Sequence, residues 1–224
     1  MKIYNYKSLD STNETAKEIL IENAVITADM QTRGKGRMGK SFFSPEGGIY
    51  MSVILKPEKS FSCLSYMSAA AAVAVCRAIM KISELKPSVK WINDIYLGDK
   101  KAGGILIESL SDYLIVGIGL NLSEQNFPDD INAAALNIDL KKEVIAEKIA
   151  EELFFVVNDK NFIDDYKKLS NIIGEKIIVY DVHDNYIAFV HDISDIGELI
   201  IKKENESDFT VLNSVGTTIR KACV

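Results

Sequence analysis

A segment that combines glycines with cationic side chains lies at 31–44 (QTRGKGRMGKSFFS). It contains no acidic residue, although the chain as a whole carries a formal net charge of -6. Glycine has no Cβ, so the backbone N–H groups of such a loop can approach a ligand closely while the basic side chains supply countercharge. The segment therefore predicts a loop that wraps an anion, and a solvated turn or a contact with nucleic-acid phosphates stay open as alternatives. The glycines are Gly34, Gly36 and Gly39, and the cations are Arg33, Lys35, Arg37 and Lys40.

A second segment, 89–109, sets polar and charged side chains into an otherwise apolar sequence. Asn93 and Asp94 are of the types that ligate or orient hydrated Mg²⁺, which usually takes one or two carboxylates together with substrate phosphates. A lysine opposite them can neutralise charge on a phosphate oxygen. Lys100 and Lys101 alone are typical of a solvated hairpin tip, so it is their combination with the glycine-rich loop that favours a functional site.

Two further patterns place polar or small residues where a ligand could lie. The segment 11–14 (STNE) has the S-x-x-E spacing of a capping box and predicts a helix start, where its side chains could also hold a polar ligand. Gly117 and Gly119 interrupt the apolar run 113–122. Because glycine weakens a strand, this pair indicates either close approach of a backbone or ligand, or a helix packed over that face.

The elements that must position these residues predict an α+β fold in two parts, a catalytic domain over 1–172 and a small β-barrel over 173–224. Apolar runs with β-branched residues predict strands, and helical spacing of apolar residues predicts helices. The first part has expected strands at 3–6, 24–28, 49–55 and 113–122, a hairpin that turns at 97–100, a buried helix at 61–82 and one or two helices within 141–169. The small barrel has expected strands at 177–180, 186–191, 199–203, 209–212 and 216–220.

The bulk composition is that of an ordinary globular protein, with 224 residues, 47% of them hydrophobic and 26% charged. A pI near 5.1 argues against general affinity for nucleic acid or anionic membranes. No signal peptide is evident, so a cytoplasmic protein is expected. The three cysteines, Cys63, Cys76 and Cys223, are expected to be reduced structural thiols, and His183 and His191 are expected to be ordinary strand or turn residues.

Together, the segments resemble those of biotin protein ligases, also called biotin-[acetyl-CoA-carboxylase] ligases. The matching pieces occur in the family's order and cover most of 8–122. They are Ser11-Thr12-Asn13, the loop Gln31-x-x-Gly34-x-Gly36-Arg37-x-Gly39, Phe43-Ser44-Pro45, Lys90-Trp91-x-Asn93-Asp94, Lys101-x-x-Gly104-Ile105-Leu106 and Gly117-Ile118-Gly119-Leu120-Asn121. Lys35 and Phe42 stand where the family usually has Arg and Trp.

The resemblance implies a mixed β-sheet flanked by helices, like that of class II aminoacyl-tRNA synthetases, with an SH3-like C-terminal barrel. It also implies a two-step reaction. The carboxylate of biotin attacks the α-phosphate of ATP to give biotinyl-5′-AMP and pyrophosphate, and a lysine of a carrier protein then attacks the mixed anhydride. Because two anions meet in the first step, cations and Mg²⁺ are needed at the phosphates.

Site residues follow from the resemblance position by position. Lys101 and Arg37 are the expected catalytic residues, with Lys101 the first choice for stabilising the transition state. Asp94 is the expected Mg²⁺ ligand. The expected biotin-binding residues are Ser11, Thr12, Asn13, Gln31, Gly34, Lys35, Gly36, Arg37, Lys101, Gly103 and Gly104, and the expected ATP-binding residues are Arg37, Lys40, Phe42, Asn93, Lys101 and Asn121. The basic loop is expected to be mobile until ligand arrives.

The expected partner is a biotin carboxyl carrier protein, with a homodimer possible and no nucleic-acid or membrane partner. Some members of the family carry an N-terminal helix-turn-helix domain, for which the position of Ser11 leaves no room, so no sequence-specific DNA binding is expected. Lipoate ligation and octanoyl transfer remain alternatives within the related fold. A noncatalytic nucleic-acid module is a remote alternative, which the acidic net charge disfavours.

Overall fold

The fold was analysed in a computed structural model that describes residues 1–57, 63–124, 127, 132–159, 161–181, 185–213 and 216–222. A seven-stranded mixed sheet has the order β1-β2-β3-β7-β6-β5-β4, in which β1 and β2 are parallel and the other neighbours antiparallel. Its strands are β1 (Lys2–Leu9), β2 (Ala24–Gln31), β3 (Gly48–Leu55), β4 (Ser88–Lys90), β5 (Asp94–Leu97), β6 (Lys100–Leu110) and β7 (Tyr113–Asn121). The helices are α1 (Thr12–Ile19), α2 (Leu64–Ile82), α3 (Lys142–Val156) and α4 (Phe162–Leu169), with a short 3-10 turn, η1 (Arg37–Gly39).

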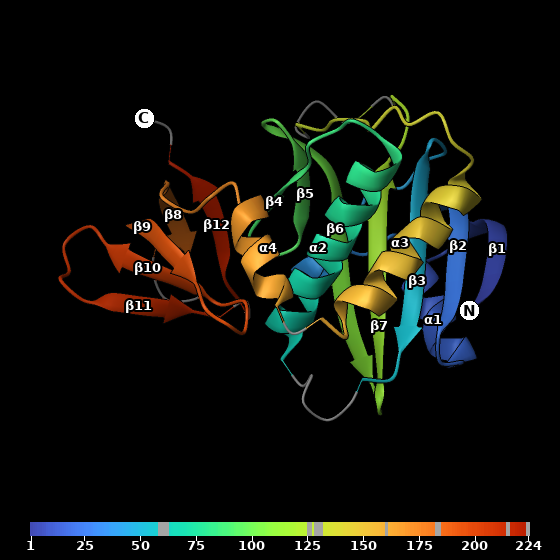
Figure 1. The fold of residues 1–224 in the computed structure, drawn as a ribbon, viewed down its shortest axis with the longest axis horizontal. Coiled ribbons are helices and arrows are strands. Elements are labelled where there is room, and N and C mark those ends of the chain that lie inside the picture. Colours follow the sequence, from blue (N-terminus) through green and yellow to red (C-terminus); the bar gives the residue numbers. More distant parts are fainter. Residues whose placement is uncertain are drawn as a thin grey trace.

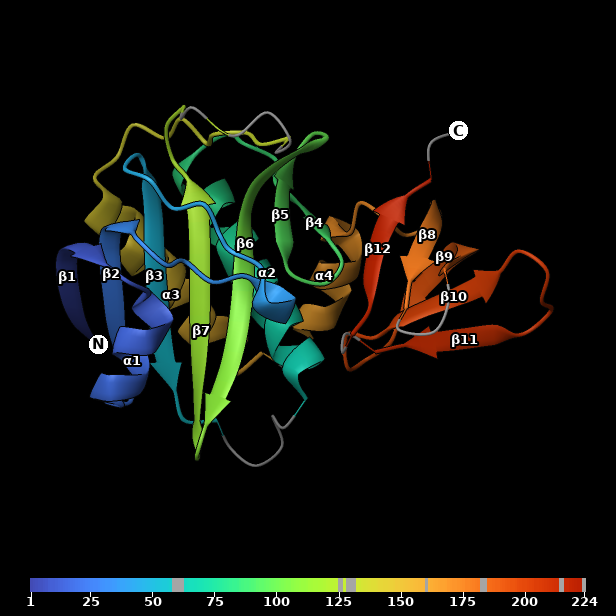
Figure 2. The ribbon, with the colours of Figure 1, turned by 180° about the vertical axis from the view of Figure 1, so that it is seen from behind.

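Helices α2 and α3 cover one face of this sheet, and α1 with the loop between β2 and β3 lies on the other (Figures 1 and 2). Strand β3 is buried along its whole length because both of its faces are covered. Helix α2 is long and apolar enough to cross a membrane, but 72% of its apolar window is buried in this core. The alanines at 69–72 are fully buried, which lets the helix pack closely on the sheet. The predicted buried helix is confirmed from Leu64 onward.

The predicted hairpin is confirmed, because β5 and β6 pair across a turn at Gly98. Strand β4 was not predicted, because the sequence analysis expects a single strand-like run before the turn at 97–100. The chain instead turns between β4 and β5, where tertiary contacts hold it. The Trp91 indole donates to the Gly197 carbonyl at 2.9 Å, and the Tyr166 hydroxyl donates to the Ile92 carbonyl at 3.1 Å. These partners lie far along the chain, so no local pattern predicts the turn.

The C-terminal strands form a second, antiparallel sheet with the order β11-β10-β9-β8-β12. Its five predicted strands are all present, as β8 (Lys176–Tyr180), β9 (Asn185–Ile193), β10 (Leu199–Lys203), β11 (Phe209–Leu212) and β12 (Thr218–Lys221). The predicted small C-terminal β unit is thus present, but the described residues show no pairing between β11 and β12, so the sheet is not closed into a barrel. Strand β12 lies beside α4 and the large sheet, away from β11 (Figure 2). The boundary predicted at 172/173 stays a prediction.

The cysteines and histidines take no part in the site described below, as far as they are described. Cys63 and Cys76 are free thiols, and burial raises the pKa of Cys76 to about 12. His191 is exposed on the second sheet and its ring lies 4.4 Å from that of Phe209. Cys223 and His183 lie outside the described residues.

Candidate active site

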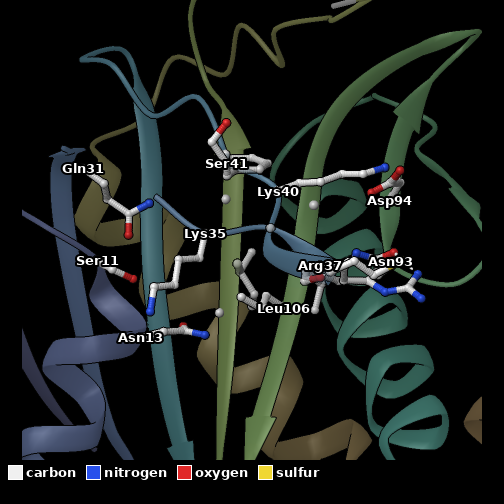
Figure 3. Close-up of a pocket in the computed structure, with 18 of the residues that line it drawn as sticks. Ser11, Asn13, Gln31, Lys35, Arg37, Lys40, Ser41, Asn93, Asp94 and Leu106 are labelled. Carbon is white, nitrogen blue, oxygen red and sulfur yellow. Dashed lines mark hydrogen bonds between the residues drawn. The ribbon is translucent and has the colours of Figure 1, made fainter. Parts of the chain in front are cut away.

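A cavity of about 210 Å³ lies between the basic loop, the start of α1 and the strands β6 and β7 (Figure 3). It brings together most of the residues that the sequence predicted. Its lining comprises Ser11, Thr12, Asn13, Gln31, Lys35, Gly36, Arg37, Met38, Lys40, Ser41, Phe42, Asn93, Asp94, Lys101, Gly104, Ile105, Leu106, Gly117, Ile118, Gly119 and Thr218. The cavity has two chemically different ends with an apolar part between them.

One end is polar and is built by the N-terminus of α1 and the end of β2. The Thr12 backbone N–H donates to Gln31 Oε1 at 2.8 Å, and Gln31 Nε2 donates to Ser44 Oγ at 3.0 Å. Ser11 is the N-cap residue, but its side chain makes no capping hydrogen bond, so the predicted capping box is wrong. Glu14 instead accepts hydrogen bonds from Lys17 and Lys35. Ser11 also lines the cavity, so its hydroxyl is available to a ligand there and is not used to cap the helix.

The apolar part is formed by β6 and β7, where three glycines leave the sheet surface flat. Gly104 pairs with Gly119, and Leu106 pairs with Gly117, so these four residues are direct neighbours across the two strands. A Cβ on Gly117 would lie 2.9 Å from Asn13 Cγ, and one on Gly119 would lie 2.8 Å from Phe42 Cζ. Of the two interpretations of this glycine pair, packing of a helix is confirmed at Gly117, whereas Gly119 meets the loop residue Phe42. Both glycines also line the cavity, so close approach of a ligand stays a prediction.

The opposite end is cationic. Lys101 Nζ lies 2.6 Å from Asp94 Oδ1, and Arg37 Nη1 donates to Asn93 Oδ1 at 3.1 Å. Burial lowers the pKa of Arg37, although the negative charge of Asp94 opposes the shift. Lys40 also lines the cavity, and the charge of Asp94 acts on Lys90 as well. Several cations thus surround one carboxylate, an arrangement that suits an anionic ligand with more than one charge.

Lys90, just beyond this end, shows how strongly positive the region is. Burial lowers the pKa of Lys90 and the charge of Asp94 raises it, while nearby Lys101, Arg220 and Lys221 lower it further. Cations so placed repel one another in the absence of a counterion. Bound phosphates would relieve this repulsion.

A protein-only metal cage is not found in the described ranges, where no three His, Cys, Asp or Glu side chains cluster suitably. Asp94 offers a single carboxylate beside the Asn93 amide. This donor set fits Mg²⁺, which keeps several waters and binds through one or two carboxylates plus substrate phosphates. It does not fit a metal held by protein ligands alone.

Three predicted site residues do not line the cavity. Gly34 closes the base of the loop, where a Cβ would lie 3.0 Å from Gln31 Nε2. Gly103 packs against β7, and a Cβ there would lie 3.3 Å from Leu120 Cα. Asn121 is buried and donates to the Ala134 carbonyl at 3.1 Å, so it fastens the chain that follows β7.

Sequence reasoning assigned no role in the site to six lining residues, Met38, Ser41, Ile105, Leu106, Ile118 and Thr218. Leu106 could have been found, because it lies two residues from Gly104 and therefore on the same face of β6. Met38 and Ser41 belong to the basic loop but carry no charge that marks them. Thr218 comes from β12, and only the tertiary fold brings it to the cavity.

The basic loop is tied to α1 and to Asp10, which lies two residues before that helix. Arg33 and Thr32 both donate to the Asp10 carboxylate, and Lys35 Nζ lies 2.8 Å from Glu14 Oε1. Within the loop, the Gly36 N–H donates to the Lys40 carbonyl at 2.7 Å. Hydrogen bonds from Lys17 and Lys35 lower the pKa of Glu14, so its carboxylate is charged at neutral pH. The expected mobility of the unliganded loop stays a prediction.

Replacing Glu14 by glutamine is expected to loosen this loop, because the neutral amide no longer forms an ion pair with Lys35. Limited trypsin digestion at pH 8 should then cut after the loop's basic residues roughly twofold to fivefold faster than in the wild type, since an exposed ion pair contributes up to about 1 kcal/mol. Glu206→Gln, which removes an exposed partner of Lys203 in the second sheet, serves as the control. Equal cutting rates in all three proteins would show that the ion pair between Glu14 and Lys35 does not hold the loop.

The family model for the biotin/lipoate A/B protein ligase family matches residues 6–121, just over half of the chain. The bifunctional ligase/repressor BirA of Bacillus subtilis is 36% identical over 153 residues, which are 63% of this chain and 46% of that protein. The biotin--[acetyl-CoA-carboxylase] ligase of Mycobacterium tuberculosis is 26% identical over 81% of this chain and 74% of its own length. This chain therefore spans less than half of the BirA relative.

Among solved structures, the biotin protein ligase of Aquifex aeolicus in complex with biotin and ATP superposes with a TM-score of 0.90 at 28% identity, covering 99% of both chains. The Leishmania major ligase with biotinyl-5-AMP has a TM-score of 0.70 at 22% identity, which shows a shared fold. The superposition extends through the second sheet, beyond the residues that the family model matches. The chain belongs to the biotin/lipoate A/B protein ligase family.

Proposed function

We propose that this protein activates biotin with ATP as biotinyl-5′-AMP and transfers the biotinyl group to a lysine of a carrier protein. The observation that carries the proposal is the cavity with two different ends. Its polar end can hydrogen-bond an uncharged ring head, its glycine-lined middle fits an aliphatic chain, and its cationic end can bind a carboxylate beside phosphates (Figure 3). The Aquifex aeolicus neighbour that binds biotin and ATP supports this assignment.

In the first step, a carboxylate oxygen of biotin attacks the α-phosphorus of ATP, and the bond to the β-phosphate oxygen breaks. Negative charge accumulates on the α-phosphoryl oxygens as two anions come together. Lys101 and Arg37 lie where they can stabilise that charge, and a partly buried setting strengthens their effect. Asp94, 2.6 Å from Lys101 Nζ, holds the ammonium in place before ligand binds.

In the second step, the uncharged amine of a carrier lysine attacks the acyl carbon of the mixed anhydride. The bond between that carbon and the phosphate oxygen breaks, AMP leaves, and the amine loses its proton as the amide forms. The same cations stabilise the departing phosphate. The basic loop covers the cavity at this stage and excludes water, which would otherwise hydrolyse the adenylate.

Mg²⁺ would be held by Asp94 and by the phosphates of ATP, and it supplies positive charge at the phosphoryl oxygens. Asn93 supports the site from the other side, since its Nδ2 donates to the Ile105 carbonyl at 2.7 Å and its Oδ1 accepts from Arg37. These two hydrogen bonds fix the Asn93 side chain and, through it, the position of the Arg37 guanidinium.

A biotin carrier domain is the proposed acceptor, as the name of the Mycobacterium tuberculosis relative indicates for that protein. The unpaired edge of β1 supports pairing with such a domain or with a second copy. The net charge of -6 supports our proposal that neither nucleic acid nor membrane is a partner. We also propose a cytoplasmic location, where carriers and ATP meet.

The experiment that tests the function is ATP–pyrophosphate exchange with Mg²⁺ in the presence of biotin, lipoate or octanoate. We expect exchange with biotin that disappears when the metal is chelated. With Mg²⁺ present, a lysine-containing carrier domain added to the mixture with biotin should become biotinylated. Exchange with lipoate alone would make lipoate the substrate in place of biotin. Absence of exchange with any of the three acids would overturn the adenylation proposal.

A further inference from the structure

A chain of polar contacts joins Asn13 to residues that do not line the cavity. Asn13 Nδ2 donates to Glu108 Oε2 at 2.7 Å, and Lys17 Nζ donates to Glu108 Oε1 at 2.8 Å. The Ser52 hydroxyl donates to Asn13 Oδ1 at 2.6 Å. Ser52 is fully buried and Asn13 is 3% exposed. Glu108 and Ser52 do not line the cavity, so they can act on a ligand only through lining residues, and both contact Asn13 directly.

These contacts fix which way the Asn13 amide points. The oxygen and nitrogen of an amide have nearly the same shape, so their positions depend on hydrogen-bond partners. Glu108 carries a carboxylate, which only accepts, and it must therefore face Asn13 Nδ2. The Ser52 hydroxyl lies beside the opposite atom, Oδ1. Glu108 therefore sets the orientation, and Lys17 secures Glu108 in turn. The Ser52 hydroxyl is compatible with it, since its single hydrogen can go to Asn13 Oδ1 or to Thr12 Oγ1, which lies 2.8 Å away.

The orientation decides what Asn13 offers a ligand. Nδ2 has two hydrogens, and Glu108 takes one. Asn13 lines the cavity, so the second hydrogen is available to a ligand there, while Oδ1 lies 2.6 Å from the Ser52 hydroxyl. Asn13 can thus donate to a ligand but is poorly placed to accept. A flipped amide would present the opposite character to the same ligand.

We infer that Glu108 is a positioning residue for substrate recognition, which sets Asn13 as a hydrogen-bond donor at the polar end of the cavity. This inference rests on the proposed function, and it narrows the substrate class to an acid whose ring head carries a carbonyl acceptor, such as a cyclic urea. An acid with a purely apolar head would leave the buried Asn13 donor without a partner, which is unfavourable. Glu108 also joins Asn13 to the basic loop, because Lys17 contacts Glu14 and Glu14 contacts Lys35.

The test compares Glu108→Ala and Glu108→Gln with the wild type. Calorimetry with biotin and with desthiobiotin, which keeps the cyclic urea but lacks the sulfur ring, gives the dissociation constants. In Glu108→Ala we expect both to rise by roughly 10- to 100-fold, the effect of leaving one buried polar group unpaired. ATP affinity should stay within twofold. Glu108→Gln should keep most of the affinity, since its amide oxygen can still accept from Asn13.

Glu204→Ala removes a comparable ion pair, with Lys176 at 2.7 Å in the second sheet, and is the matched control. It should bind biotin as the wild type does. Wild-type affinity in Glu108→Ala would overturn the inference alone. So would an equal loss of biotin and ATP affinity that follows a fall in Tm, because that pattern marks a general structural role. A wild-type protein that binds no biotin would overturn the proposed function and this inference with it.

Discussion

Replacing Lys101 by alanine is expected to lower the rate of biotin-dependent ATP–pyrophosphate exchange by roughly 10²- to 10³-fold, the usual cost of losing one group that stabilises transition-state charge. The substitution removes a cation from the end of the cavity where carboxylate and phosphate must meet. It also removes the partner that lies 2.6 Å from Asp94, so that less positive charge offsets this carboxylate beside the phosphates. Single-turnover formation of the adenylate measures the effect on chemistry directly.

Lys100→Ala is the matched control, because it makes the same change in net charge one residue away. Lys100 is exposed at the start of β6 and does not line the cavity. Its rate should stay within about twofold of the wild type, since exposed charges are screened. If the two variants lost activity equally, the general positive field would matter and the specific position of Lys101 would not.

Most strands of the large sheet could be predicted because their apolar runs and turn residues are local features of the sequence. The run 49–55 is apolar throughout, and β3 is buried on both faces. The turn at Gly98 follows from residues that favour hairpins. Strand β4 could not be found in this way, because the turn after it depends on Tyr166 and Gly197, which are distant in the chain.

The candidate site was predictable where residue type itself carries the chemistry. Glycines next to cations indicated the basic loop, and Asn93 with Asp94 indicated the cationic end of the cavity. The roles of neutral residues were harder to assign. Asn121 shares a strand with two site glycines, yet its side chain fastens the segment after β7. Ser52 lies in an apolar run, and nothing in its local sequence shows that its hydroxyl meets Asn13.

The ion pairs of Glu14 could not be predicted from the sequence for a similar reason. The spacing of Ser11 and Glu14 matches a capping box, and local geometry alone would favour it. Lys35 and Lys17 compete for the same carboxylate and outweigh the local contact, because they bring a full positive charge to Glu14. The competing partner Lys35 is 21 residues away in the chain, so the outcome depends on the tertiary fold.

Replacing Gly117 by alanine is expected to weaken biotin binding by roughly 100-fold while the protein still folds. The new Cβ would lie 2.9 Å from Asn13 Cγ and 3.0 Å from Asn13 Nδ2. Asn13 cannot easily move away, because Ser52 and Glu108 hold both ends of its amide. Strand β7 is equally constrained, since it is paired with β3 on one side and β6 on the other. The side chain that presents the donor must therefore leave its position.

Overpacking of this kind also lowers stability by about 1–3 kcal/mol, so a stability control is needed. Ile115→Val provides it, because Ile115 lies two residues away on the same face of β7 but is buried in a small apolar cluster with Ala16 and Ile54. That change should cost about 0.5–1.5 kcal/mol and leave the biotin dissociation constant unchanged. Calorimetry with biotin and thermal unfolding on both variants separate the two effects. Should Gly117→Ala bind biotin as tightly as Ile115→Val, the Asn13 side chain would not be needed at the position that it occupies, and contacts from Thr12 and Gln31 would have to account for recognition at the polar end.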